Sequence, residues 1–262
     1  MAVLCRMVMH LFFAVCMISG GKHKMAYFAA ENLHQEFENI TINVSFECEK
    51  STMTCIVGPS GSGKSTVLRL ISGLNKPLTS KNENSILPKQ RIILDDYDIS
   101  NLPPAKRNIG MVFQSHSLFD HLTVAQNVAY GLISKGMKKK EAMIMACDFL
   151  KQFDLNGFED RFPETLSGGE AQRVCLARTL IMKPKLVLFD EPLSALDAPL
   201  RKKLAKLIKT SQEKIGFTGI MVTHDLDEAK SIANKILLMK KGEIVWSGNP
   251  SDFEENFLTD LN

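Results

Sequence analysis

A glycine-rich stretch near the start of the chain has the composition of a phosphate-binding loop. Residues 58–65 read GPSGSGKS and fit the pattern GxxxxGK[ST], directly after the apolar run MTCIV. Glycines let the backbone N–H groups of such a loop converge on phosphate oxygens, and the N-terminus of a following helix adds positive potential. Lys64 can reach the β- and γ-phosphates, and the Ser65 hydroxyl can bind Mg²⁺. The stretch predicts nucleotide binding without specifying the reaction.

Polar side chains follow three other apolar runs. LVLFDEP places Asp190 at the end of a strand, where Mg²⁺ bridging the phosphates would lie, and Glu191 next to it can polarise an attacking water. IGMVFQ ends in Gln114, which can bind Mg²⁺ or water without adding charge, and MVTHDLDEA supplies His224. A lone histidine of this kind is more often structural. Ligands of open α/β sheets bind at the carboxyl ends of the strands, so together these side chains predict one site.

A second anion-binding turn lies far from the first. LSGGE, residues 166–170, has a serine and paired glycines at the mouth of a predicted helix, which is a backbone arrangement suited to holding an anion. One chain therefore carries two phosphate-binding turns.

The elements that must position these residues alternate between strands and helices. Residues 40–48 alternate apolar and polar side chains like a half-buried strand, and short apolar runs predict buried strands. Residues 123–153 are largely helical in pattern, whereas residues 75–90, rich in Asn, Ser, Lys and Pro, predict a surface loop or insertion. This order predicts an α/β fold with a mainly parallel sheet covered on both faces and a helical insertion at about residues 114–165.

The composition narrows the class of protein. The 262 residues are 45% hydrophobic and 23% charged, as in an ordinary globular protein, and the net charge of +3 is too small to indicate nucleic-acid binding. The six cysteines are scattered without metal-binding spacing, so we expect reduced thiols. Residues 1–24 superficially resemble a secretory signal. We consider three interpretations of these residues, in decreasing order of preference: translation in fact starts at Met25, the segment contacts a membrane peripherally, or it is a secretory signal.

Taken together, these motifs resemble those of the ATP-binding subunits of ABC transporters, from about Phe28 to the C-terminus. The resemblance implies that residues 25–262 form one ATP-binding domain with the P-loop NTPase fold. It also implies an N-terminal antiparallel β portion and a helical subdomain between the Q-loop, at Gln114, and the LSGGE signature. SALD resembles the D-loop, with Asp197. ATP and Mg²⁺ are the implied ligands.

The resemblance also explains the second anion-binding turn. Two such subunits associate head to tail, and the signature of one closes on the γ-phosphate held by the other. Lys64 and Ser65 would hold phosphates and Mg²⁺, with Asp190 and Gln114 also at the metal. Glu191 would act as general base, and His224 and Gln114 would sense the γ-phosphate. The residues that would bind the nucleotide are Gly58, Pro59, Ser60, Gly61, Ser62, Gly63, Lys64, Ser65, Thr66 and Phe37. Those acting on the partner's nucleotide are Leu166, Ser167, Gly168, Gly169 and Glu170.

Some positions depart from the family pattern. Glu170 stands where glutamine is usual, which we expect to alter detail and not function. Phe37, the candidate for stacking on adenine, lacks the expected following glycine, and a core aromatic is the other interpretation. Residues 75–90 replace a short glycine-containing turn. Because the sequence stops soon after Trp246, we expect it to lack the regulatory domain of sugar importers.

Within the family, the region around Gln114 resembles bacterial importer subunits for polyamines, iron, sulfate, molybdate or thiamine. Leu118, Phe119 and Leu122 would line a groove for a helix of the membrane protein, or belong to the local core. The expected partners are a second ATPase subunit, permease subunits and a substrate-binding protein, with no nucleic acid, at the cytoplasmic face of the membrane. The alternative function is a soluble ABC-type ATPase without a role in transport. A nucleotide kinase is disfavoured by the signature and by His224.

Overall fold

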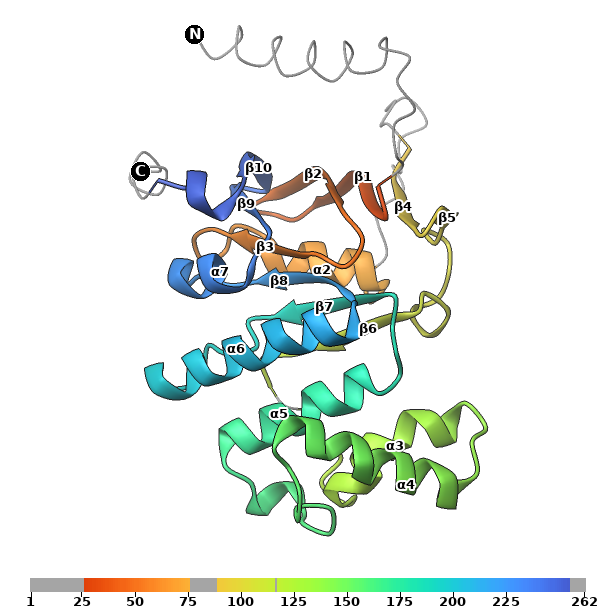
Figure 1. The fold of residues 1–262 in the computed structure, drawn as a ribbon. Coiled ribbons are helices and arrows are strands. Elements are labelled where there is room, and N and C mark those ends of the chain that lie inside the picture. The colour runs from red at the N-terminus through yellow and green to blue at the C-terminus, as the bar shows by residue number, and fades with distance from the viewer. Residues whose placement is uncertain (1–25, 76–88, 116, 255–262) are drawn as a thin grey trace, which may run out of the picture.

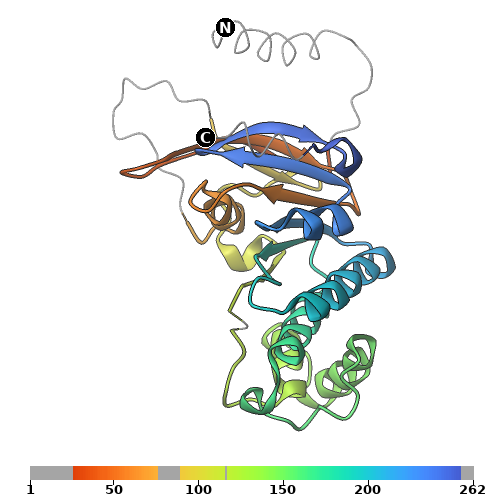
Figure 2. The same cartoon turned by 90° about the vertical axis from the view of Figure 1, so that its left-hand side faces the viewer.

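The computed structural model describes residues 26–75, 89–115 and 117–254. The predicted N-terminal extension, Met25 and most of the predicted insertion at 75–90 lie outside these residues. The strands form two sheets, and the helices within residues 124–180 lie below both sheets in Figure 1 and in Figure 2. No helix in the described ranges is both long and apolar enough to span a membrane. Among the described residues, Cys48, Cys55 and Cys147 are free thiols, as expected for them.

The first sheet is antiparallel and has the strand order β2-β1-β4-β5. Its strands are β1 (Phe28–Glu36), β2 (Thr41–Cys48), β4 (Arg91–Leu94) and β5 (Tyr97–Asp98). The strict exposed–buried alternation along β2 confirms the half-buried strand expected there. This sheet is the expected N-terminal antiparallel portion.

The second sheet carries the site and has the order β10-β9-β3-β8-β7-β6. Its strands are β3 (Met53–Val57), β6 (Ile109–Val112), β7 (Leu186–Asp190), β8 (Thr218–Val222), β9 (Lys235–Lys240) and β10 (Glu243–Gly248). All neighbours are parallel except β9 and β10. The predicted mainly parallel sheet is therefore confirmed.

Both faces of this sheet are buried, which accounts for its continuous apolar strands. Along β7, Leu186 and Leu188 face a core shared with α2 and the antiparallel sheet, whereas Val187 and Phe189 face a core shared with the later helices. The helices are α2 (Lys64–Ser72), α3 (Val124–Ser134), α4 (Lys139–Leu150), α5 (Gly168–Leu180), α6 (Ala198–Ile215) and α7 (Leu226–Ile232). Short 3₁₀ turns occupy Pro104–Lys106, Lys151–Phe153, Pro163–Thr165 and Pro250–Asp252.

A buried arginine holds the helix that follows the phosphate loop. Arg107 is 4% exposed, and its guanidinium donates hydrogen bonds to the carbonyls of Leu70 and Ile71 in the last turn of α2, at 3.0 and 2.7 Å. It also bonds the carbonyls of Ser100 and Leu102. A cation is favourable at the negative end of a helix dipole, so Arg107 fixes α2 and the residues at its N-terminus.

Candidate nucleotide site

The phosphate loop joins the end of β3 to the start of α2, as predicted. Gly63 precedes the helix with φ of 98°, a conformation that favours glycine, and a Cβ there would lie 2.1 Å from the Ile42 side chain. The Lys64 ammonium donates hydrogen bonds to the carbonyls of Gly58 and Pro59, at 2.8 and 2.9 Å. Burial lowers the pKa of Lys64, and the nearby carboxylates of Glu191 and Asp190 oppose that shift. The loop thus holds a cation against its own backbone.

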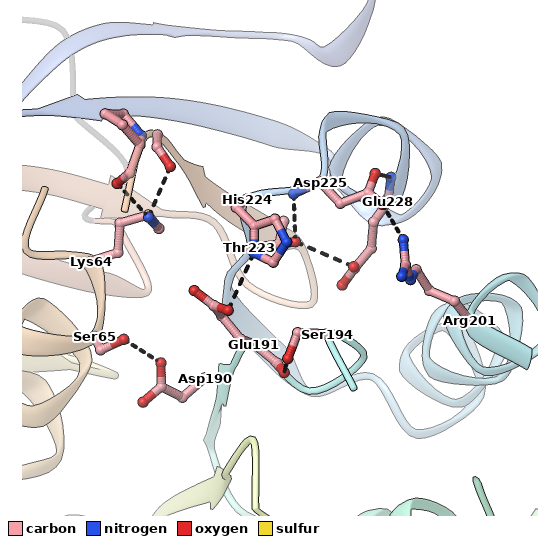
Figure 3. A network of polar contacts seen from close by, with 12 residues as sticks. Lys64, Ser65, Asp190, Glu191, Ser194, Arg201, Thr223, His224, Asp225 and Glu228 are labelled. Atoms are coloured by element: carbon pink, nitrogen blue, oxygen red, sulfur yellow. Dashed lines mark hydrogen bonds and ion pairs between the residues drawn. The ribbon is translucent and has the colours of Figure 1, made fainter. Parts of the chain in front are cut away.

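Ser65 and Asp190 meet at the carboxyl edge of the sheet. The Ser65 hydroxyl donates a hydrogen bond of 2.6 Å to Oδ1 of Asp190, although the two residues are 125 positions apart in the sequence (Figure 3). A hydroxyl and a carboxylate are hard oxygen ligands, and Mg²⁺ uses one or two protein ligands together with phosphates and water. The described residues contain no cluster of three or more His, Cys, Asp or Glu side chains that could hold a metal. The Ser65–Asp190 pair therefore suits Mg²⁺, which phosphates and water also hold, better than it suits a metal bound by protein side chains alone.

Glu191 and His224 face each other across the ends of β7 and β8. Oε2 of Glu191 lies 3.2 Å from Nδ1 of His224 (Figure 3). Glu191 has φ of 47°, an uncommon left-handed conformation for a non-glycine residue. Its backbone N–H donates to the Val222 carbonyl, and its own carbonyl accepts from Ser194. Such strain persists where surrounding bonds enforce it and is concentrated at functional sites, so the turn that aims Glu191 at His224 supports a functional role.

A polar network behind His224 was not predicted from the sequence. Arg201 forms an ion pair of 2.7 Å with Asp225, and the Thr223 hydroxyl donates to Glu228. Glu228 is 6% exposed, and its burial raises its pKa to about 7. The acidic residues Asp225 and Glu228, which follow His224 in the sequence, could have indicated such a network. Their basic partner, Arg201, lies on α6 and could not be inferred from that stretch.

The signature begins α5, as expected. Ser167 is the N-cap: its hydroxyl accepts from the N–H of Glu170, and the Glu170 carboxylate accepts from the N–H of Ser167. This reciprocal pair is a capping box, which a glutamate forms as well as a glutamine. A Cβ on Gly169 would lie 2.6 Å from the side chain of Leu200, so the signature packs directly against the start of α6. In Figure 1, β7 and β6 lie between α2 and α5.

Three of the predicted residues show no hydrogen bond or ion pair to this cluster in the described structure. Gln114 is exposed just beyond β6, and no hydrogen bond joins it to Ser65 or Asp190. Asp197 is the exposed N-cap of α6, without a side-chain capping bond. Phe37 lies in the turn between β1 and β2 and is 45% exposed, which excludes the core-aromatic interpretation. Because Ile42 on β2 packs against Gly63, the hairpin that carries Phe37 adjoins the phosphate loop.

The residues after Gln114 divide between core and surface. Leu118 packs on the main core. The ring of Phe119 lies 4.6 Å from the ring of Tyr130, which is 48% exposed, and the Arg178 guanidinium lies 5.5 Å from Phe119. Leu122 is half-buried. Of the predicted groove, Phe119 is the residue that joins a partly exposed aromatic surface.

Comparisons with known proteins find one matching family. The ABC transporter family model matches residues 41–194. The Fe(3+) ions import ATP-binding protein FbpC of Brucella abortus is 44% identical over 227 residues, or 86% of this chain and 62% of that protein. The protein of the same name from Fusobacterium nucleatum is 44% identical over 85% of this chain and 58% of its own length. The chain thus spans about three fifths of the length of these curated relatives.

Two solved structures share the fold. One is a dimeric ATP-binding cassette in a post-hydrolysis state with bound ADP and Pi, with a TM-score of 0.71 and 31% identity, covering 86% of this chain and all of that one. The other is cbiO1 of Clostridium perfringens, part of an ABC transporter complex, with a TM-score of 0.75 and 26% identity, covering 87% of this chain and 90% of that one.

Proposed function

Because the chain belongs to the ABC transporter family, we propose that it binds and hydrolyses ATP and thereby energises a bacterial solute importer. The observation that carries this proposal is the convergence of Lys64, the Ser65–Asp190 pair and the Glu191–His224 pair at one edge of the sheet. Side chains from three separate motifs meet where a phosphate loop would present a nucleotide.

Each residue has a distinct part in the proposed reaction. Lys64 and the loop N–H groups bind the β- and γ-phosphates, and Ser65 and Asp190, with Gln114, hold Mg²⁺. Bound Mg²⁺ neutralises charge that develops on the phosphate oxygens. Glu191 orients a water and accepts its proton, while His224, 3.2 Å from that carboxylate, contacts the γ-phosphate and fixes Glu191. Phe37, at the exposed turn, stacks on the adenine.

The proposed active unit is a head-to-tail dimer in which Ser167, Gly168 and Gly169 contact the partner's γ-phosphate. The open N-terminus of α5 supports this because it presents backbone donors beside Ser167. ATP then holds the dimer closed, and loss of the γ-phosphate releases it. One solved relative is itself a dimer with ADP and Pi.

The substitution Glu191→Gln tests the hydrolytic assignment. The variant keeps the size of the side chain and its capacity to contact His224 but removes the base, so ATP should still bind. We expect turnover to fall at least about a hundredfold, the low end for loss of a general base, and an ATP-dependent dimer to accumulate. ATPase rates and size-exclusion chromatography with ATP measure both effects. An unchanged ATPase rate would exclude Glu191 as the base.

Transport is favoured over the soluble alternative because the relatives are named as import proteins. We propose that the chain binds permease subunits peripherally at the cytoplasmic face of the membrane, through the surface around Phe119 and Tyr130, in a system that also has a substrate-binding protein. Ferric iron is the first solute to test. Affinity purification of tagged Glu191→Gln protein with ATP from detergent-solubilised membranes should recover a polytopic membrane protein. Recovery of soluble partners alone would favour the alternative.

A further inference from the structure

Arg201 joins two loops that flank the hydrolytic site. Its Nη1 donates to Oδ2 of Asp225 at 2.7 Å, and its Nη2 donates to the carbonyl of Leu196 at 3.0 Å. The two acceptors come from different parts of the chain: Leu196 precedes α6, whereas Asp225 follows His224. Figure 3 shows the ion pair between Arg201 and Asp225. A planar guanidinium can hold two such acceptors in a fixed relation, which a single amine cannot.

The Leu196 end of this bridge is packed against the signature. Leu196 is 9% exposed, and a Cβ on Gly168 would lie 3.7 Å from its side chain. Gly169 approaches Leu200 even more closely. Close-packed contacts transmit strain, so a displacement of the start of α5 would be passed on to the segment around Leu196.

The Asp225 end of the bridge fixes the backbone around His224. Asp225 accepts a hydrogen bond from the N–H of Glu228 through Oδ1 and thereby caps α7, while Oδ2 binds Arg201. The N–H of Asp225 donates to the hydroxyl of Thr223. His224 therefore lies between Thr223 and Asp225, both of which are fixed by hydrogen bonds. Its ring projects toward Glu191 (Figure 3).

We propose that Arg201 is a positioning residue that holds His224 in place relative to the signature, and so couples the nucleotide site of one subunit to the turn that serves its partner. This inference rests on the proposed ATPase function and its dimer. The signature, on contacting the partner's phosphate, shifts the Leu196 segment; Arg201 passes that shift to Asp225 and hence to His224.

Spare bonding capacity lets the bridge change partners. Nε of Arg201 and Oε1 of Glu228 are both buried, and neither has a hydrogen-bond partner among the described residues. They are complementary groups on adjoining helices. A movement of α7 that brought these two atoms together would let Arg201 bond Glu228 in place of Asp225 without leaving the guanidinium unpaired.

Kinetics of three variants test the proposal. Arg201→Met removes both bonds, Arg201→Lys keeps the charge but not the fork, and Lys202→Met, at an exposed position on the same helix, is the control. We expect kcat to fall about tenfold in Arg201→Met and less in Arg201→Lys, with KM for ATP within about twofold of wild type. Equal kcat in Arg201→Met and Lys202→Met would overturn the proposal. So would a tenfold rise in the KM of Arg201→Met without loss of kcat.

A double-mutant cycle with Asp225→Asn separates coupling from general damage. Asparagine can still cap α7, so this variant loses the ion pair and little else. If the bridge acts as one unit, Arg201→Met in the Asp225→Asn background should add less than about a twofold further loss of kcat. Fully multiplicative losses would contradict the bridge.

Hydrogen exchange provides a test that does not depend on hydrolysis. In Arg201→Met, amides of residues 195–198 and 223–229 should exchange faster than in Lys202→Met, while those of β3 stay unchanged. Unchanged exchange in both segments would overturn the inference even if the wild type hydrolyses ATP. A wild type without ATPase activity but with the expected exchange would instead refute the proposed function.

Discussion

Glu170 places a negative charge at a turn proposed to bind phosphate. Its hydrogen bonds with Ser167, led by the one from the Ser167 backbone N–H, lower the pKa of Glu170, so it is ionised at neutral pH. The capping geometry explains why glutamate is tolerated here, because the carboxylate points back to the N-cap. The substitution of glutamate for glutamine thus alters electrostatics and leaves the start of α5 intact.

The variant Glu170→Gln should therefore strengthen ATP-dependent dimer formation. The amide oxygen can keep the bond to Ser167, while repulsion of the partner's γ-phosphate disappears. An exposed charge interaction is worth about 0.5–1 kcal/mol, so half-maximal dimerisation should need roughly two- to fivefold less ATP. Light scattering in the Glu191→Gln background measures this, and the difference should shrink at high salt. A shift toward higher ATP concentrations would contradict the proposed contact.

At the level of single residues, the sequence predicts those whose chemistry is carried by a motif. Lys64, Asp190 and His224 each follow an apolar run, and the parallel order of the strands brings them to one edge of the sheet. The functions of Arg201 and Glu228 could not be predicted in this way. Both depend on how α6 and α7 pack, and residue spacing contains no measure of that packing.

At the level of elements, the sequence predicts the strands that are either buried throughout or alternate regularly between buried and exposed residues. β3 and β7 are buried at every residue, and β2 alternates strictly, so their patterns are unambiguous. β1 is different: its pairing with β2 shifts register between Ala30 and Leu33, and Asn32 between them has φ of 52°. A bulge of this kind breaks the two-residue period on which strand prediction depends.

The helix α7 carries a proton-binding group that should make folding depend on pH. Burial raises the pKa of Glu228 to about 7 from an ordinary value of 4.5, with a further rise from Asp225 and Glu191 and opposition from Thr223 and Arg201. The native protein therefore binds this proton more tightly than the unfolded chain. Its stabilising contribution is full below pH 4.5, is lost progressively as the pH rises toward 7, and stays lost above that.

Glu228→Gln removes this pH dependence because its amide does not titrate. When the pH is raised from 5 to 8, the wild type should lose about 2–3 kcal/mol more of its free energy of unfolding than the variant does. Urea unfolding at both pH values measures the shift, and Glu213→Gln, at an exposed position on α6, is the control. Parallel pH curves for wild type and Glu228→Gln would show that Glu228 is ionised to the same degree in both states.

At the level of the whole molecule, the two anion-binding turns belong to different units of the fold. The phosphate loop leads from β3 of the second sheet to α2 and packs against Ile42 of the first sheet, while Arg107 holds the far end of α2. The signature begins a helix that packs against α3, α4, α6 and β6. No hydrogen bond joins the two turns within the described residues. A chain built in this way favours two composite sites in a head-to-tail dimer over one site made by a single chain.

Mixing two inactive variants distinguishes these arrangements. Lys64→Met disables the phosphate loop. Gly168→Asp adds a charge to the signature, and the structure accommodates it, because a Cβ there meets only Leu196, at an ordinary 3.7 Å, and an acid suits the first turn of a helix. Each variant alone should be inactive, since both of its sites carry the same defect. In a mixed dimer of head-to-tail geometry, one site receives both defects and the other receives none.

In a random one-to-one mixture, half of the dimers are mixed and each holds one intact site, so ATPase activity should return to about a quarter of the wild-type value. A value below that would indicate that the two sites depend on each other, as the Arg201 bridge implies. Combining both substitutions in one chain and mixing it with wild type provides the converse test. In a head-to-tail dimer each site of the mixed dimer then carries one defect, so only the wild-type dimers, about a quarter of the total, should be active. No recovery from the two single variants, together with about half of the wild-type activity in this second mixture, would mean that the signature serves the nucleotide of its own chain.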